Sequence, residues 1–248
     1  MSNYLFHGCD VVALAQTYGT PLYVMSEDEI VKKIRAVKAL FDERVERCLT
    51  HYASKAFLTR DMLRILKREG IGLDVVSGGE LHLAREMDFD PRLVTFHGNS
   101  KTEAEIAAGL DYGVGEFVCD SAEEIATIDR ISEARGRIAD ILIRVSPETE
   151  SRTHAHMATV GRGSKFGIPP VVLEDAVRLC ERLPRIRLRG FHFHVGSQLM
   201  DNESHLEGLE AVLGQIARIH ASCGYAPETL DMGGGFGVAY TEDDRPEP

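Results

Sequence analysis

Short apolar segments rich in β-branched residues recur along the chain, and helical periodicity follows most of them. They occupy residues 48–54, 71–77, 92–98, 115–120, 139–146, 187–195 and 228–232. The first five begin about 23, 21, 23 and 24 residues apart, which is enough for a strand, a turn and a helix of three turns. Strands that alternate with helices in this way predict a parallel sheet with helical crossovers.

The expected helix starts carry a signal of their own. At four of them a serine is followed three residues later by a glutamate, which is the capping-box pattern. The pairs are Ser26–Glu29, Ser77–Glu80, Ser100–Glu103 and Ser121–Glu124. Apolar residues at helical spacing, such as Ile125, Ile128 and Ile131, come after the serines. The pattern therefore predicts helices that begin directly after these four serines.

Two fold types have this alternation of strands and helices. They are the doubly wound sheet and the (β/α)8 barrel, and the long series of consecutive strand–helix units favours the barrel. We find no eighth strand, and residues 241–248 are polar and contain proline, as expected of an exposed tail or a cut end. The predicted fold class is therefore α/β, a TIM-like (β/α)8 barrel incomplete at its C-terminal end, with residues 1–248 as one barrel domain.

Charge and cysteine content narrow the range of partners. The chain has 28 Lys+Arg against 39 Asp+Glu, a net charge of -11, without a basic block, which argues against nucleic acid or an anionic membrane. No run reaches the roughly 18 apolar residues of a membrane span, and the N-terminus lacks a secretory signal pattern. The five cysteines have no close spacing and are typical of reduced thiols. We expect a cytoplasmic protein that acts on a small molecule.

A lysine ends the first repeated strand. Alternation along residues 51–55 puts His51, Ala53 and Lys55 on one face, with Lys55 at the C-terminal end. Barrel enzymes build their active sites at that end of the strands. Small apolar neighbours can partly desolvate a lysine there, which favours the free amine that Schiff-base chemistry needs. The alternative is an ordinary solvated lysine at a strand end.

Two histidines alternate in the segment 187–195. His192 and His194 share one face, and the phenylalanines beside them pack on the other. The segment is followed by Gly196 and Ser197, where a bare backbone and a hydroxyl can approach an anion. A His-x-His pair on a barrel strand indicates metal ligands or a wall that stacks on a ring. For a single histidine, the alternative is a satisfied core residue.

A glycine run follows the last strand segment. Gly233, Gly234 and Gly235 can expose successive backbone N–H groups in a concave nest that suits phosphate. No Gly-Lys-Ser/Thr follows, as a P-loop would require, and Val238 stands where a dinucleotide fingerprint needs its last glycine. The run could also be a flexible tight turn. If it binds phosphate, it indicates a small phosphorylated cofactor or substrate.

Asp74 lies within an otherwise apolar strand segment, where a carboxylate is costly unless it is paired. It could balance a lysine or a cofactor hydroxyl, or it could be a surface residue at the strand end. Taken together, a lysine, an imidazole, a hydroxyl and a glycine nest on successive strand ends indicate a pocket for pyridoxal 5'-phosphate. The amine would form a Schiff base, the imidazole would cover the ring, and the hydroxyl and nest would hold the phosphate.

Six segments resemble, in order, the barrel-domain motifs of the diaminopimelate decarboxylase family. They are YASKAF at 52–57, LDVVSGGEL at 73–81, FHGNSK at 96–101, SKFGI at 164–168, FHFHVGSQ at 191–198 and LDMGGGFG at 230–237. The wider group includes the ornithine and arginine decarboxylases, which use pyridoxal phosphate on an alanine-racemase-like barrel. The resemblance extends from about Tyr18 to Gly237, and the HGN and GSQ sequences are more similar to the diaminopimelate branch.

The resemblance implies a role for each matching residue. Lys55 would be the Schiff-base lysine, His194 would stack on the cofactor ring, and Asp74 would lie beside the lysine and cofactor. Ser197 and the run Gly233–Gly235 would hold the phosphate, and no metal is implied. The implied reaction converts meso-2,6-diaminopimelate to L-lysine and CO2, and the implied full-length enzyme is a homodimer.

The sequence departs from the family pattern in one respect. The family's Glu-Pro-Gly-Arg motif and its C-terminal β-domain, which carries a cysteine of the partner's site, are not found in these 248 residues. We therefore expect the N-terminal part of such an enzyme, with little activity by itself.

Other functions remain open from the sequence. One is a decarboxylase of another basic amino acid such as ornithine or arginine, and another is a non-catalytic pyridoxal-phosphate barrel protein. A metal-dependent barrel hydrolase would use His192 and His194, and would need further ligands for which only His51 and Asp74 are candidates.

Overall fold

The computed structural model describes residues 4–42, 44–147 and 166–246. Its main feature is a sheet of seven parallel strands, in which strands that follow each other along the chain are neighbours in space. The strands are β3 (His51–Ala53), β4 (Gly72–Val75), β5 (Val94–Phe96), β6 (Glu116–Cys119), β7 (Ala139–Arg144), β8 (Ile186–His192) and β9 (Thr229–Asp231). Each overlaps one predicted segment. The α/β fold class and the parallel order are therefore confirmed.

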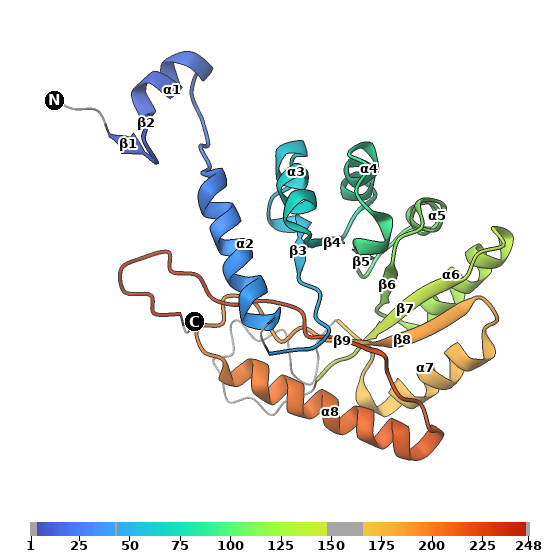
Figure 1. Ribbon diagram of the computed structural model, residues 1–248. Helices are drawn as coiled ribbons and strands as arrows, with labels where there is room; N and C mark the ends of the chain where they lie inside the picture. Colours follow the sequence, from blue (N-terminus) through green and yellow to red (C-terminus); the bar gives the residue numbers. More distant parts are fainter. Residues whose placement is uncertain (1–3, 43, 148–165, 247–248) are drawn as a thin grey trace.

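Helices cover the outer side of the curved sheet (Figure 1). They are α2 (Glu27–Asp42), α3 (Arg60–Glu69), α4 (Gly78–Glu86), α5 (Glu103–Tyr112), α6 (Ala122–Ala134), α7 (Pro170–Arg182) and α8 (Glu203–Cys223). Their apolar stripes and the outward-facing residues of the strands form one core, in which Phe96, Phe117 and Ile128 are fully buried. Because the helices occupy the outside, the inner side of the sheet and its strand ends are left for polar residues.

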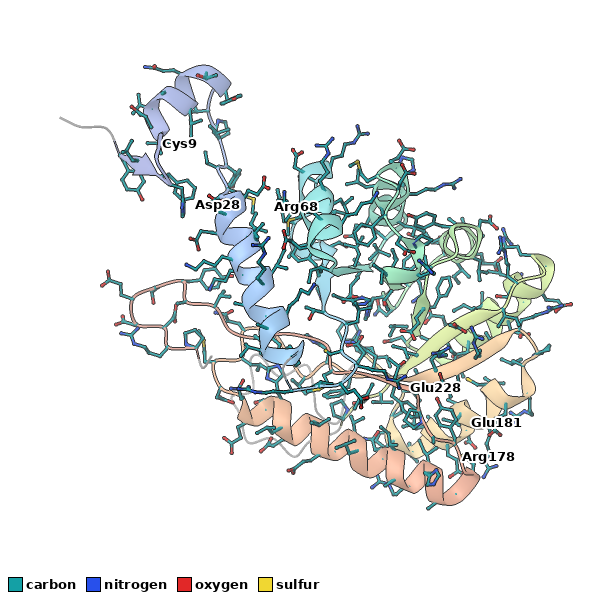
Figure 2. All side chains as sticks on the ribbon, in the orientation of Figure 1. Cys9, Asp28, Arg68, Arg178, Glu181 and Glu228 are labelled. Atoms are coloured by element: carbon teal, nitrogen blue, oxygen red, sulfur yellow. The ribbon has the colours of Figure 1, made fainter. Side chains whose placement is uncertain are left out.

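The N-terminal segment forms a small arm that stands apart from the sheet (Figure 1). It consists of a two-stranded hairpin, β1 (Leu5–Phe6) and β2 (Cys9–Asp10), followed by α1 (Val11–Tyr18). Figure 2 labels Cys9 on this arm. No residue of α1 is buried. The arm thus contributes little to the core of the sheet.

Three of the four predicted helix starts are confirmed and one is wrong. The hydroxyls of Ser26, Ser77 and Ser121 each accept a hydrogen bond from the backbone N–H three residues later. Ser100 caps no helix, because α5 begins later and its capping box is formed by Thr102 and Glu105. The displacement has a physical cause: the chain turns at Gly98, with φ +102, and then buries the side chain of the next lysine before the helix begins.

Two further features bear on the setting of the protein. Within the described ranges, no helix is both long enough and apolar enough to cross a membrane. None of the five cysteines, which all lie in the described ranges, forms a disulfide. Cys119 and Cys180 are buried in the core, and burial raises the pKa of the Cys180 thiol to about 12. These two thiols are inert packing residues.

Candidate active site at the carboxyl ends of the strands

Lys55 lies just beyond the carboxyl end of β3. The strand ends at Ala53, and Lys55 is in a short 3-10 turn, η1 (Ser54–Ala56). The alternation predicted from His51 to Lys55 therefore stops before the lysine, and the turn determines its position. The hydroxyl of Ser54 donates to the carbonyl of Asp74 at 2.6 Å, which fixes the turn to β4. The Lys55 side chain itself is exposed.

His194 lies two residues beyond the end of β8 and approaches Lys55. Burial and then the positive charge of Lys55 lower the pKa of His194 to about 4. The imidazole is therefore neutral at physiological pH. The backbone N–H of Gly234 donates to its Nδ1 at 3.4 Å. His194 thus contacts the glycine loop of β9 and lies within the influence of the Lys55 charge.

The glycine loop after β9 has a backbone that requires glycine at two positions. Gly233 and Gly235 have φ values of +68 and +101, and a Cβ at Gly235 would collide with the carbonyl oxygen of Gly196. At Gly234, by contrast, a Cβ would meet no described atom within 4 Å apart from those of the residue and its two chain neighbours. The loop is therefore closed against its neighbours on both sides and open in the middle. Such an opening leaves room for a ligand to approach the backbone.

The loops after β8 and β9 are hydrogen-bonded to each other. Leu199 N–H donates to the Gly235 carbonyl at 2.9 Å, and Gly237 N–H donates to the Leu199 carbonyl at 2.7 Å. Ser197 lies in the same loop as Leu199 and is exposed. The predicted phosphate-binding residues therefore belong to two loops that hold each other in place.

Asp74 lies on β4, paired in register with Ala53 of β3. Its Oδ1 lies 2.9 Å from His51 Nδ1 and 3.5 Å from His97 Nε2. Burial acts to raise the pKa of Asp74, but His97 and His51 outweigh it and hold the pKa far below its usual range. Asp74 is therefore an ionised, paired carboxylate at the inner side of the sheet and not a surface residue.

Four further residues at these strand ends received no role in the sequence analysis. His97 follows β5, Asp231 ends β9, and Arg144 ends β7 at 3.7 Å from Asp120. Asp231 Oδ2 lies 3.8 Å from His97 Nε2, and its Oδ1 accepts the N–H of Gly233 at 2.7 Å. Each was visible only as a polar residue at the end of an apolar segment, which does not identify its partner.

His192 differs from His194 although both belong to one His-x-His sequence. His192 is buried, and burial followed by the charges of His97 and Arg144 holds the pKa of its imidazole well below the usual value. Its ring meets that of His97 edge-on at 4.9 Å. Among the described residues its Nδ1 has no hydrogen-bond partner. His192 is thus an inner wall, whereas His194 reaches the rim of the sheet.

These groups fit pyridoxal phosphate. Three groups lie at the same edge of the sheet. They are an exposed amine, a neutral imidazole whose pKa the charge of that amine lowers, and a glycine loop that is open at Gly234. Lys55 could hold the aldehyde carbon, His194 the ring face, and Ser197 with the loop Gly233–Gly235 the phosphate. The motif segment at 164–168 lies partly outside the described residues.

Comparison with known proteins gives a consistent result. The family model described as "Pyridoxal-dependent decarboxylase, pyridoxal binding domain" matches residues 27–248. The diaminopimelate decarboxylase of Bacillus methanolicus is 37% identical over 243 residues, covering 97% of this chain and 56% of the relative. That of Bacillus subtilis (strain 168) is 35% identical over 241 residues, with coverages of 96% and 55%. The chain spans about half the length of these curated relatives.

Solved structures show the same partial overlap. Diaminopimelate decarboxylase from M. jannaschii in complex with L-lysine has a TM-score of 0.89 and 31% identity, covering 98% of this chain and 57% of that one. A lysine/ornithine decarboxylase from Vibrio vulnificus complexed with putrescine has a TM-score of 0.79 and 26% identity, with coverages of 95% and 58%. Both structures overlay on nearly all of this chain.

Proposed function

This chain belongs to the pyridoxal-dependent decarboxylase family, whose pyridoxal-binding domain it matches over residues 27–248, and we propose that it binds pyridoxal phosphate for the decarboxylation of meso-2,6-diaminopimelate to L-lysine and CO2. The observation that carries the proposal is the meeting of Lys55, His194 and the glycine loop of β9 at one edge of the sheet. Metal ligands have no part in it.

Each residue of this edge has a physical task in the proposed site. Lys55 has an exposed amine, so it can reach the cofactor aldehyde. His194 is neutral, so it offers an uncharged ring face. Ser197 supplies a hydroxyl for the phosphate, and the loop Gly233–Gly235 supplies backbone N–H groups. Those of Gly233 and Gly234 donate to Asp231 Oδ1 and His194 Nδ1 in this structure and would exchange these acceptors for the phosphate. The bound cofactor acts as an electron sink for the electrons left by CO2, whereas the protein supplies orientation and electrostatics.

The diaminopimelate substrate is supported by the relatives. Curated relatives at 35% and 37% identity are named diaminopimelate decarboxylase, and the lysine-bound M. jannaschii structure has a higher TM-score and identity than the putrescine-bound lysine/ornithine decarboxylase. A substrate with a second carboxylate requires a positive partner that ornithine does not need. Relative turnover of diaminopimelate and ornithine can therefore distinguish this enzyme class from the other decarboxylases.

Carbon dioxide release from three amino acids tests the proposal. The full reading frame that contains this chain should release CO2 from meso-diaminopimelate at least tenfold faster, in kcat/KM, than from ornithine or arginine, since a lost charge partner costs roughly 1.4 kcal/mol or more. The Lys55→Ala variant should release none above background. Turnover of ornithine or arginine in preference to diaminopimelate would contradict the substrate, and cofactor binding without any turnover would favour a non-catalytic role.

We also propose a cytoplasmic location and a homodimeric full-length enzyme. The absence of disulfides among the five cysteines of the described ranges supports a reducing compartment. The dimer rests on the family resemblance, and light scattering of the full reading frame measures it directly.

A further inference from the structure

The inner side of the sheet carries a network of buried ionisable side chains that the proposed function does not use in full. His97 Nε2 lies 3.5 Å from Asp74 Oδ1 and 3.8 Å from Asp231 Oδ2. In the sheet, β5, β6, β7 and β8 lie between β4, which carries Asp74, and β9, which carries Asp231. His97 therefore connects carboxylates that only the curvature of the sheet brings together.

Asp74 depends on this connection because its surroundings disfavour a charge. Burying an ionised carboxylate is costly unless it is paired. His51 Nδ1 is hydrogen-bonded to Asp74 Oδ1 at 2.9 Å. His97 Nε2 lies 3.5 Å away, makes no hydrogen bond among the described residues, and acts through its charge, which is the largest of the influences that hold the pKa of Asp74 low. Asp231 is held less strongly, and burial raises its pKa. The pKa of Asp74 is thus lowered and that of Asp231 is raised, although both carboxylates lie near the same imidazole.

The rings of this network have fixed positions. A Cβ at Gly72 would collide with the imidazole of His51, so a glycine there makes room for that ring. The backbone N–H of His97 donates to the Val75 carbonyl at 2.8 Å, and the ring of His97 packs edge-on against His192. The ionisable groups that interact with His97 are Asp74, His192, His194 and Asp231. His51, Glu116 and Arg144 face the same network through these groups.

A metal ion is the competing interpretation of the same groups. The ligand atoms of His97, His192 and Asp231 lie within 4.8 Å of one another. However, the histidine nitrogens lie 3.8 and 3.9 Å from Asp231 Oδ2, whereas ligands at zinc distances of about 2.0–2.1 Å are only about 3.3 Å apart in a tetrahedron. The ligand atoms are therefore too far apart for metal coordination, and we interpret the network as hydrogen-bonding and charged groups that act without a metal.

We propose that His97 is a positioning residue, which holds the ionised Asp74 carboxylate in place between β4 and β9 at the strand ends that carry Lys55 and the glycine loop. The functional meaning of this inference rests on the proposed function, since the ionised Asp74 matters where Lys55 takes up the cofactor. The interaction between His97 and Asp74 itself does not depend on a bound cofactor. Loss of the His97 nitrogen should release the charge of Asp74 without loss of the fold.

Two variants separate positioning from packing. His97→Phe keeps a ring and removes the nitrogens, whereas His97→Gln keeps an N–H donor at similar reach. Carbon-13 NMR of aspartate-labelled, cofactor-free chain follows Asp74, assigned with Asp74→Asn. The wild-type Asp74 signal should not titrate down to acid unfolding. His97→Phe should bring its titration into the accessible range, and His97→Gln should restore part of the wild-type behaviour.

The second readout is cofactor retention. Binding of pyridoxal phosphate should be weakened about tenfold in His97→Phe and about threefold in His97→Gln, because an uncharged ring no longer stabilises the ionised Asp74 and an amide does so only in part. The control is His82→Phe, a change at an exposed histidine of α4, which should leave both readouts unchanged.

The outcomes are distinct. An unshifted Asp74 titration in His97→Phe overturns the positioning role, whatever the cofactor does. Stoichiometric binding of Zn²⁺ by the wild-type chain that is lost in Asp231→Asn also overturns it and assigns a metal site. A shifted Asp74 together with no cofactor uptake at Lys55 supports the positioning role and contradicts the proposed function.

Discussion

Lys55 and Lys101 occupy similar places and have opposite surroundings. Each lies in the turn after a strand, Lys55 after β3 and Lys101 after β5. The Lys101 side chain is 1% exposed, and its Nζ donates to the carbonyls of Gly98 and Val118, both at 2.7 Å, and pairs with Glu124 at 2.8 Å. Lys55 is exposed, and among the described residues it makes no hydrogen bond or ion pair.

The difference shows what separates a structural lysine from a reactive one. The Lys101 Nζ donates to two carbonyls, one in its own turn and one in β6, and forms an ion pair with Glu124 of α6. This buried ammonium links three elements and is held away from any ligand. The Lys55 amine is not engaged in this way and lies near the neutral imidazole of His194. Schiff-base formation requires an accessible amine that is not held by other groups, as at Lys55.

The largest expected effect is on covalent cofactor capture. Borohydride reduction of the chain with pyridoxal phosphate should fix the cofactor on Lys55, and Lys55→Arg should abolish the label, because a guanidinium cannot form the bond. Lys101 should remain unlabelled, since its amine is buried and held by two carbonyls and Glu124. Peptide mapping by mass spectrometry measures both sites. A label on Lys101 that persists in Lys55→Arg would reverse the comparison.

The next effect is on the free energy of unfolding, to which the buried Lys101 should contribute more than an exposed lysine does. Lys101→Met should lower the free energy of unfolding by about 3 kcal/mol, because it leaves Glu124 buried without its partner. Lys67→Met, at an exposed lysine that also donates to backbone carbonyls, should cost under about 1 kcal/mol. Urea unfolding measures both.

A double variant sharpens this result. Adding Glu124→Leu to Lys101→Met should recover part of the loss, since the uncompensated charge is then gone. A Lys101→Met chain as stable as the wild type would show that the buried ion pair contributes nothing net.

A moderate effect concerns the pH dependence of stability that arises because burial, and then the charge of Lys55, lower the pKa of His194. The folded-state pKa of His194, about 4, lies below the ordinary value of 6.5. As the pH falls, the unfolded chain is therefore protonated at a higher pH than the folded chain. The stabilisation by this group is fully present above pH 6.5 and is lost as the pH falls from 6.5 to about 4. Linkage puts the loss at roughly 3 kcal/mol.

Replacement variants measure the contribution of each cause. His194→Gln should flatten the stability profile in this window. Lys55→Met should raise the pKa of His194 as measured by proton NMR, because the nearby positive charge is removed, while burial continues to hold it below 6.5. Lys101→Met should not change it. An unchanged His194 titration in Lys55→Met would mean that the two side chains do not interact.

The smallest expected effect is at the start of α5, next to Lys101. Thr102→Ala removes the cap and should cost about 1 kcal/mol. Ser100→Ala, at the position where the sequence pattern predicts the cap, should change the free energy of unfolding by less than about 0.5 kcal/mol. Thermal or urea unfolding distinguishes the two. Equal losses would indicate that Ser100 also caps the helix.

The order of the strands followed directly from the sequence. Apolar segments and helical stripes are local patterns, and short connections make consecutive strands neighbours. The cap of α5 was misplaced by two residues because Ser-x-x-Glu and Thr-x-x-Glu overlap there at 100–105. Only the burial of Lys101 by the preceding turn decides between them.

The sequence by itself determined the repeating strand–helix pattern, the end of the sheet where polar residues gather, and the Lys, His and Gly candidates placed there. The tertiary structure alone decided which of them meet. His97 and Asp231 are 134 positions apart by number (231 − 97), and their contact exists because the sheet curls. Periodicity reports the face on which a residue lies, whereas pairing of charges across the sheet depends on its curvature, which arises from the packing of all its strands and helices together.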